Sequence, residues 1–155
     1  MSIINLDHLA ANPLLPEVQE AMIEAIKKNY EEETGLGEIW GKEISEGDYK
    51  HKKYSILAAG YELSVPVTVH AAIGTDFTHI HPSFNGSKMG QGTYNDFKLF
   101  TSIIAHLEGG GCFFNIGSSV LLPEVFLKGL SVARNLGFDT RGFTTVNMDM
   151  VQHYR

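Results

Sequence analysis

The sequence contains a single cysteine, Cys112, and no apolar run long enough to cross a membrane. One thiol cannot form a disulfide within the chain, which fits a protein of a reducing compartment. A membrane-spanning helix needs about 20 apolar residues, and the opening "MSIINLDHLAANP" lacks the basic start and apolar stretch of a signal peptide. We therefore predict a soluble, cytoplasmic protein without a membrane partner. Because Cys112 lies in the apolar run "GCFFNI", we expect a buried, inert thiol.

Positive charge is also scarce. The chain has 12 lysines and arginines against 18 aspartates and glutamates, a formal net charge of −6 at pH 7. Binding of nucleic acid depends on clustered lysine and arginine, and the short basic cluster Lys50-His51-Lys52-Lys53 is typical of a solvated helix start. We therefore expect no nucleic-acid partner and predict a small-molecule ligand instead.

The first third of the chain has helical patterns. With 155 residues, the chain suits one domain that buries about 68–70% of its unfolded surface. We predict an N-terminal helical segment over residues 1–50 and an α/β core over residues 51–155, the whole being a compact domain or part of a longer family chain. Apolar residues at helical spacing predict three helices, over residues 13–30, 39–44 and 53–62.

Strand and helix patterns alternate through the rest of the chain. Strands are predicted for "VPVTVHAA", "GGGCFFNIG" and "GFTTVNMD", with a loop over residues 74–92 after the first of them. Helices are predicted from Thr93, which with Asp96 resembles a capping box, and from Pro123 to a stop at Gly137. This alternation predicts βαβ units and a parallel sheet.

Polar residues follow each predicted strand. Right-handed crossovers bring the carboxyl ends of parallel strands to one edge of the sheet, where ligands bind in open sheets of this kind. The expected binding residues are, strand by strand, His70, Thr75, Asp76, His79 and His81, then Asn115, Gly117, Ser118 and Ser119, then Asn147 and Asp149.

The stretch "NIGSSVLLPEV" has two interpretations. A turn of small residues before a helix exposes N–H groups to a phosphate or carboxylate, and Ser118 and Ser119 add hydroxyl donors. Alternatively, the serines only cap the helix, and Glu124 would repel a nearby anion. Both interpretations stay open at this point.

The stretch "VHAAIGTDFTHIHPSFNG" has three interpretations. His70, Asp76, His79 and His81 could bind zinc or another divalent ion, although their spacing matches no standard motif. Alternatively, Asp76 accepts hydroxyl groups of a ribose or the amine of a substrate, with His70 or His79 as catalytic acid or base. The third interpretation is that these side chains only tie down a long loop.

A series of short motifs has a familiar order. The motifs are Gly41-Lys42-Glu43-Ile44, Val65-Pro66-Val67, Thr75-Asp76, Asp96, Gly109-Gly110-Gly111 and "FTTVNMD". In this order, over Trp40 to Asp149, the chain resembles deoxyhypusine synthase, and "HAAIGTD" and "PEVFLK" resemble uncharacterised bacterial proteins of that kind more closely. The resemblance implies a Rossmann-like NAD-binding fold preceded by N-terminal helices, a tetramer with sites at subunit contacts, and transfer of an aminobutyl group from spermidine. It also implies that Asp76 lines the cofactor cleft.

The chain departs from that family at its catalytic centre. The family's catalytic lysine follows the last strand, and this sequence ends at Arg155 without that motif. Trp40-Gly41-Lys42 lies upstream of the predicted strands, so Lys42 is not assigned as the nucleophile, and the family's histidine pair after the triple glycine is missing.

Three functional hypotheses follow. We expect a deoxyhypusine synthase-like protein that binds NAD or a related nucleotide at the strand ends, without true deoxyhypusine synthesis. The alternatives are a metal-dependent hydrolase using the histidine cluster, and a non-catalytic oligomeric domain. Since a three-stranded sheet has edges to cover, we also expect a homo-oligomer.

Overall fold

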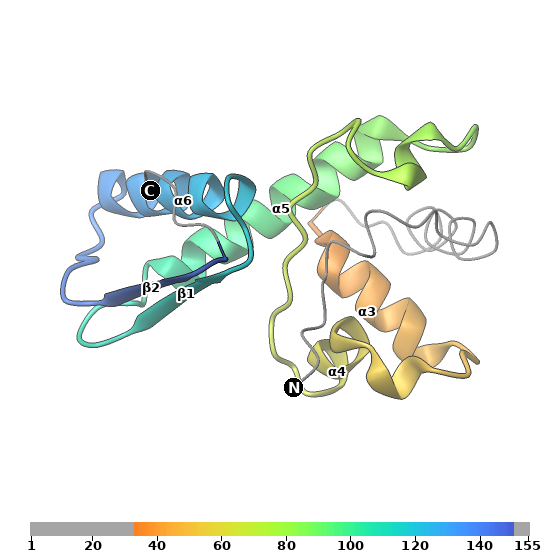
Figure 1. Cartoon of the computed structure of the whole chain (residues 1–155), viewed down its shortest axis with the longest axis horizontal. Helices are drawn as coiled ribbons and strands as arrows, with labels where there is room; N and C mark the ends of the chain where they lie inside the picture. The colour runs from red at the N-terminus through yellow and green to blue at the C-terminus, as the bar shows by residue number, and fades with distance from the viewer. Residues whose placement is uncertain (1–32, 151–155) are drawn as a thin grey trace. The chain divides into compact units, whose positions relative to one another are not determined.

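The computed structural model describes residues 33–150, which fall into two compact units (Figure 1). The first unit extends to Thr93 and the second begins at Tyr94, a boundary that falls inside helix α5 (Gly86–Ile104). The helix predicted over residues 13–30 lies outside the described residues. Among the described residues, no helix is long and apolar enough to span a membrane.

The first unit is built on two helices, α3 (Leu36–Glu46) and α4 (Ile56–Glu62), which pack together across the predicted domain boundary at residue 50. The predicted helical turn at residues 39–44 is confirmed as part of α3, and the predicted helix over residues 53–62 divides into a short 3-10 helix, Lys52–Tyr54, and α4. The core of the unit consists of Leu36, Ile39, Trp40 and Met89.

The prediction of a strand at "VPVTVHAA" is wrong. Residues 65–72 have no regular secondary structure, and the hydroxyl of Thr93 makes the contacts that a neighbouring strand would make. Thr93 Oγ1 donates to the carbonyl of Val69 at 2.8 Å and accepts from the N–H of Ala71 at 2.9 Å. Thr93 lies within α5, so it is not the helix cap that the sequence predicted. Pro66 also lacks the N–H that a central strand would donate.

The second unit contains a parallel pair of strands joined by a helix. The strands β1 (Cys112–Ile116) and β2 (Thr144–Met148) run side by side, and α6 (Leu121–Asn135) connects them (Figure 1). These three predicted elements are confirmed. The fold is α/β in the general sense, but the two-stranded sheet is not the Rossmann-like or deoxyhypusine synthase-like fold that we predicted, because the first predicted strand does not form.

Aromatic packing forms the core of the second unit. The ring of Phe113 on β1 stacks on Phe126 of α6, with centroids 3.8 Å apart and planes 7° from parallel, and Phe143 meets Phe126 edge-on. Side chains alternate along β1, so that Phe113 is half-buried and Cys112 is exposed. The prediction of a buried thiol is therefore wrong, because Cys112 lies on the opposite face of the strand from this core.

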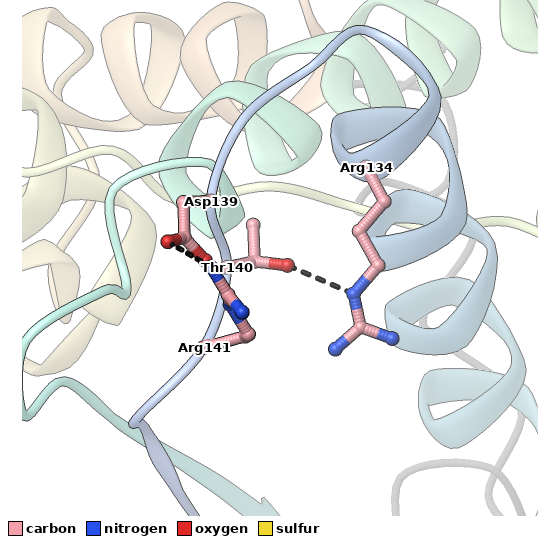
Figure 2. Close-up of polar contacts among 4 residues, drawn as sticks. All are labelled: Arg134, Asp139, Thr140 and Arg141. Atoms are coloured by element: carbon pink, nitrogen blue, oxygen red, sulfur yellow. Dashed lines mark hydrogen bonds and ion pairs between the residues drawn. The ribbon is translucent and has the colours of Figure 1, made fainter.

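The end of α6 follows the predicted pattern. Gly137 has a φ of +92°, and its N–H donates to the carbonyl of Arg134, while Phe138 N–H donates to the carbonyl of Ala133. After this turn, Arg134 Nε donates to the buried Thr140 Oγ1 at 3.0 Å (Figure 2). This contact secures the connection from α6 to β2.

A substitution at Gly37 tests the packing of the first unit. A Cβ at this position in the first turn of α3 would lie 1.7 Å from the carbonyl oxygen of Val67, a backbone atom. We expect Gly37→Ala to lower the free energy of unfolding by about 2 kcal/mol or more, because the extended segment must move away from α3. Chemical denaturation of the full chain measures the effect.

Gly90→Ala is the matched control. Gly90 lies within α5, where an added Cβ would meet only Ile73 Cδ1 at 3.9 Å. The alanine should therefore stabilise the chain by about 0.5–1 kcal/mol through its better helix propensity. Equal effects of the two substitutions would contradict the close packing at Gly37.

Candidate functional site

The carboxyl ends of β1 and β2 meet at one edge of the sheet. Asn115 and Asn147 are register partners in neighbouring strands, and Asn115 Nδ2 donates to Asn147 Oδ1 at 2.6 Å. The same amide donates to the carbonyl of Ser118 at 2.8 Å. Because Asn115 is only 7% exposed, this buried amide holds the loop after β1 against the end of β2.

Two further contacts join the loops at this edge. Gly117, with a φ of +70°, donates its N–H to the carbonyl of Met148 at 2.9 Å. Beyond it, Ser119 Oγ donates to Asp149 Oδ2 at 3.1 Å. The carboxylate after β2 therefore lies beside the hydroxyl that precedes α6, and Ser119 is exposed while Asp149 is half-buried. The structure brings together the six residues predicted at the ends of these two strands and in the loops that follow them.

The start of α6 is only partly available to an anion. Ser118 Oγ accepts the N–H of Leu122 in the first turn of α6 at 3.1 Å, so its hydroxyl is used by the helix start, in line with the second interpretation of the stretch, although the N-cap residue itself is Val120. Pro123 has no N–H to offer, and Glu124 places a carboxylate in the first turn, where it pairs with Lys128 at 3.0 Å. The edge is thus better suited to hydroxyl groups of a ligand than to several phosphates.

The aspartate and one histidine of the stretch from Val69 to Gly86 hold their own loop. Asp76 Oδ1 accepts the N–H of Thr78 at 2.8 Å and its hydroxyl at 2.7 Å. His79 Nδ1 accepts the N–H groups of Gly74 at 2.9 Å and Asp76 at 3.2 Å. The two side chains form a reciprocal capping box around the 3-10 helix Phe77–Ile80.

The remaining predicted residues of the stretch also make local contacts. Thr75 Oγ1 donates to the carbonyl of Ala72 at 2.6 Å, His81 Nδ1 accepts the N–H of Ser83 at 3.2 Å, and His70 Nε2 lies 3.0 Å from Thr68 Oγ1. Within residues 33–150, no three His, Cys, Asp or Glu side chains gather closely enough to hold a metal ion. The loop-tying interpretation is therefore the one that the observed contacts support.

The second unit also contains a pocket that the sequence did not predict. It has a volume of about 330 Å³ and lies between α5 and the last turns of α6. Phe97, in the helix predicted from Thr93, lines it. The signal in the sequence is that Phe97, Phe100 and Ile104 recur at helical spacing, and Ala105 directly after them also lines the pocket.

Comparison with known proteins adds no assignment. No protein-family model matches the chain, and no curated protein or solved structure matches it either. The relationship to deoxyhypusine synthase stays a prediction from the motifs alone.

Replacing the buried amide tests how the strand ends are held together. Asn115→Asp keeps the shape but puts a carboxylate where Nδ2 donates to Asn147 Oδ1 and the Ser118 carbonyl. We expect the free energy of unfolding to fall by about 3 kcal/mol at pH 7, because a buried charge then faces two acceptors. The control is Asn85→Asp, since Asn85 uses only its oxygen, which accepts Lys88 N–H at 3.0 Å. If urea denaturation shows the same loss for both variants, the amide does not have this role.

His70 makes the stability of the chain depend on pH. Burial lowers the pKa of its imidazole below the ordinary value, so the folded state favours the neutral ring. The neutral His70 ring contributes its full stabilisation above about pH 6.5, the ordinary pKa of histidine. This contribution is lost as the pH falls from there toward the lower pKa of the folded state. In thermal unfolding between pH 8 and pH 5, His70→Gln should show a smaller loss of stability than the parent. Parallel pH profiles would contradict this assignment.

Proposed function

We propose that the protein binds a small molecule of the nucleotide type, NAD or a related nucleotide, at the carboxyl ends of β1 and β2. The observation that carries this proposal is the contact between Ser119 and Asp149, which places a carboxylate beside the turn that leads into α6. In dinucleotide-binding βαβ units, an acidic residue after the second strand accepts a ribose hydroxyl, and the pyrophosphate lies at the helix start. The β1–α6–β2 unit has the same order of parts.

The polar atoms at the edge suit the sugar better than the phosphates. Asp149 Oδ2 accepts from an exposed serine, so a ribose hydroxyl could take the place of Ser119 at little cost. The phosphates would meet the first turn of α6, where the Ser118 hydroxyl already accepts the N–H of Leu122 and Glu124 is acidic. The glycine fingerprint G-x-G-x-x-G is also absent from "NIGSSV". These features favour ligands recognised through their hydroxyl groups, with a weak contribution from phosphate.

The observed contacts support binding rather than catalysis. Asp76 and His79, which we predicted as catalytic residues, accept hydrogen bonds from the loop that contains them. His70 contacts the hydroxyl of Thr68. The proposed ligand therefore depends on Asn147, Ser119 and Asp149 in the second unit.

Ligand-dependent unfolding tests the proposal. At 100 times its dissociation constant, NAD should raise the free energy of unfolding of the full chain by about 2.7 kcal/mol. Asp149→Asn removes the charge that would accept the ribose hydroxyl, and a tenfold weaker affinity would halve the gain to about 1.4 kcal/mol. Asp139→Asn is the control, because Asp139 lies in the α6–β2 connection and pairs with Arg141 (Figure 2).

Comparison of NAD, AMP, adenosine and inorganic phosphate shows which part of the nucleotide is recognised. If the edge recognises the sugar, adenosine and AMP should both shift the unfolding curve, and inorganic phosphate at the same concentration should not. No shift with NAD, AMP or adenosine would overturn the proposal. An equal loss in the Asp149 and Asp139 variants would exclude the strand ends as the binding site.

A further inference from the structure

The pocket of the second unit is an apolar hollow on the surface of two helices. Its base contains two small buried residues, Ala105 directly after α5 and Ala133 of α6, which are 4% and 1% exposed. Its edge contains large apolar side chains that stay accessible, among them Leu136 and Phe138, at 70% and 47% exposure. Small residues at the base and large ones at the edge leave the hollow of about 330 Å³.

The glycine of α6 near this base sets how closely the helices approach. A Cβ on Gly129 would lie 2.7 Å from Ile104 Cδ1 and 3.2 Å from Thr101 Oγ1 of α5. The helices are therefore in contact one turn before Ala133, and the hollow opens where α6 ends. A volume of 330 Å³ is at the lower end of the range for small-molecule pockets, about 300–1,000 Å³.

The walls are aromatic. Tyr94 and Phe97 are one turn apart on α5, with ring centroids 6.4 Å apart, and Phe138 also lines the pocket, with its ring centroid 6.4 Å from that of His106. Aromatic side chains favour flat aromatic partners through offset and edge-on contacts. The body of a ligand that fits this pocket is therefore a small aromatic ring system.

The ionisable nitrogen side chains that line the pocket are Lys98 and His106, and no acidic side chain lines it, although the whole chain has a net charge of −6. Lys98 Nζ lies 5.3 Å from the ring centroid of Tyr94. His106 Nδ1 lies 2.8 Å from the carbonyl of Ser102, and since a carbonyl only accepts, Nδ1 carries the hydrogen and Nε2 of the neutral ring is an acceptor. The pocket therefore complements a negative group.

Two of the three lining hydroxyls are already used as donors. Thr101 Oγ1 donates to the carbonyl of Phe97 at 2.8 Å, and Ser102 Oγ donates to the carbonyl of Leu99 at 2.7 Å. The positive charge for an anion therefore comes from Lys98, and the third lining hydroxyl, that of Tyr94, is a further donor. We propose that this pocket binds an aromatic monocarboxylate, with the ring between α5 and α6 and the carboxylate at Lys98. This site has no residue in common with the strand ends and is independent of the nucleotide proposal.

Binding of 2-naphthoate to the full chain, followed by calorimetry, tests the proposed site. The neutral isostere 2-naphthalenemethanol has the same ring system without the charge, so we expect it to bind at least tenfold more weakly. Lys98→Gln should weaken naphthoate binding about five- to tenfold and leave the alcohol unchanged. The matched control is Lys128→Gln on α6, because Lys128 pairs with Glu124 and does not line the pocket.

A second variant tests the location of the ring. Val132 lines the pocket and is 38% exposed, so Val132→Trp can fill the hollow without disturbing the buried core, which circular dichroism and the unfolding temperature will check. This variant should lose both ligands. Equal affinities for the acid and the alcohol, equal effects of the two lysine variants, or unchanged binding in a folded Val132→Trp chain would each overturn the proposal, as would no binding of naphthoate at millimolar concentration.

Discussion

The stacking of Phe113 on Phe126 is the contact on which the second unit depends. With centroids 3.8 Å apart, these rings fix β1 against α6, and the edge-on contact of Phe143 fixes the start of β2 against the same ring. Since both strands are held by one helix, their carboxyl ends emerge side by side. The hydrogen bonds of Asn115 and the contact of Ser119 with Asp149 follow from this placement. The pocket depends on it too, because the same helix provides Ala133 and ends at the C-cap residue Leu136.

Elements with strong local signals were predictable from the sequence. The strand–helix–strand unit formed as expected because β-branched and aromatic runs alternate with a helix that has Pro123 in its first turn and Gly137 after its end. The prediction failed at residues 65–72, where the side chain of Thr93 replaces a neighbouring strand. It also placed the start of α5 too late, because Gly86, Gly90 and Gly92 suggest a loop. Gly92 is instead required by packing, since a Cβ there would lie 2.6 Å from Leu36 Cδ2.

At the candidate site, too, some features could be predicted from the sequence and others could not. The residues at the ends of β1 and β2 could be predicted because parallel strands place their ends at one edge. The roles of the histidines could not, because a ring nitrogen can bind a ligand or accept a backbone N–H with equal ease. His79 accepts two such groups, which depends on the local path of the chain and not on residue type. The pocket was missed because it depends on how α5 and α6 end, which periodicity within each helix does not show.

The face of β1 that points away from the aromatic core is exposed in the described part of the chain, with Phe114 and Ile116 at 54% and 65%. The association of copies of the chain stays a prediction. Cys112 lies on the same exposed face and is the only thiol of the sequence. A maleimide fluorophore would therefore attach to this strand at a single known position without any substitution. The sequence thus carries, on β1 itself, a single attachment site for a spectroscopic label.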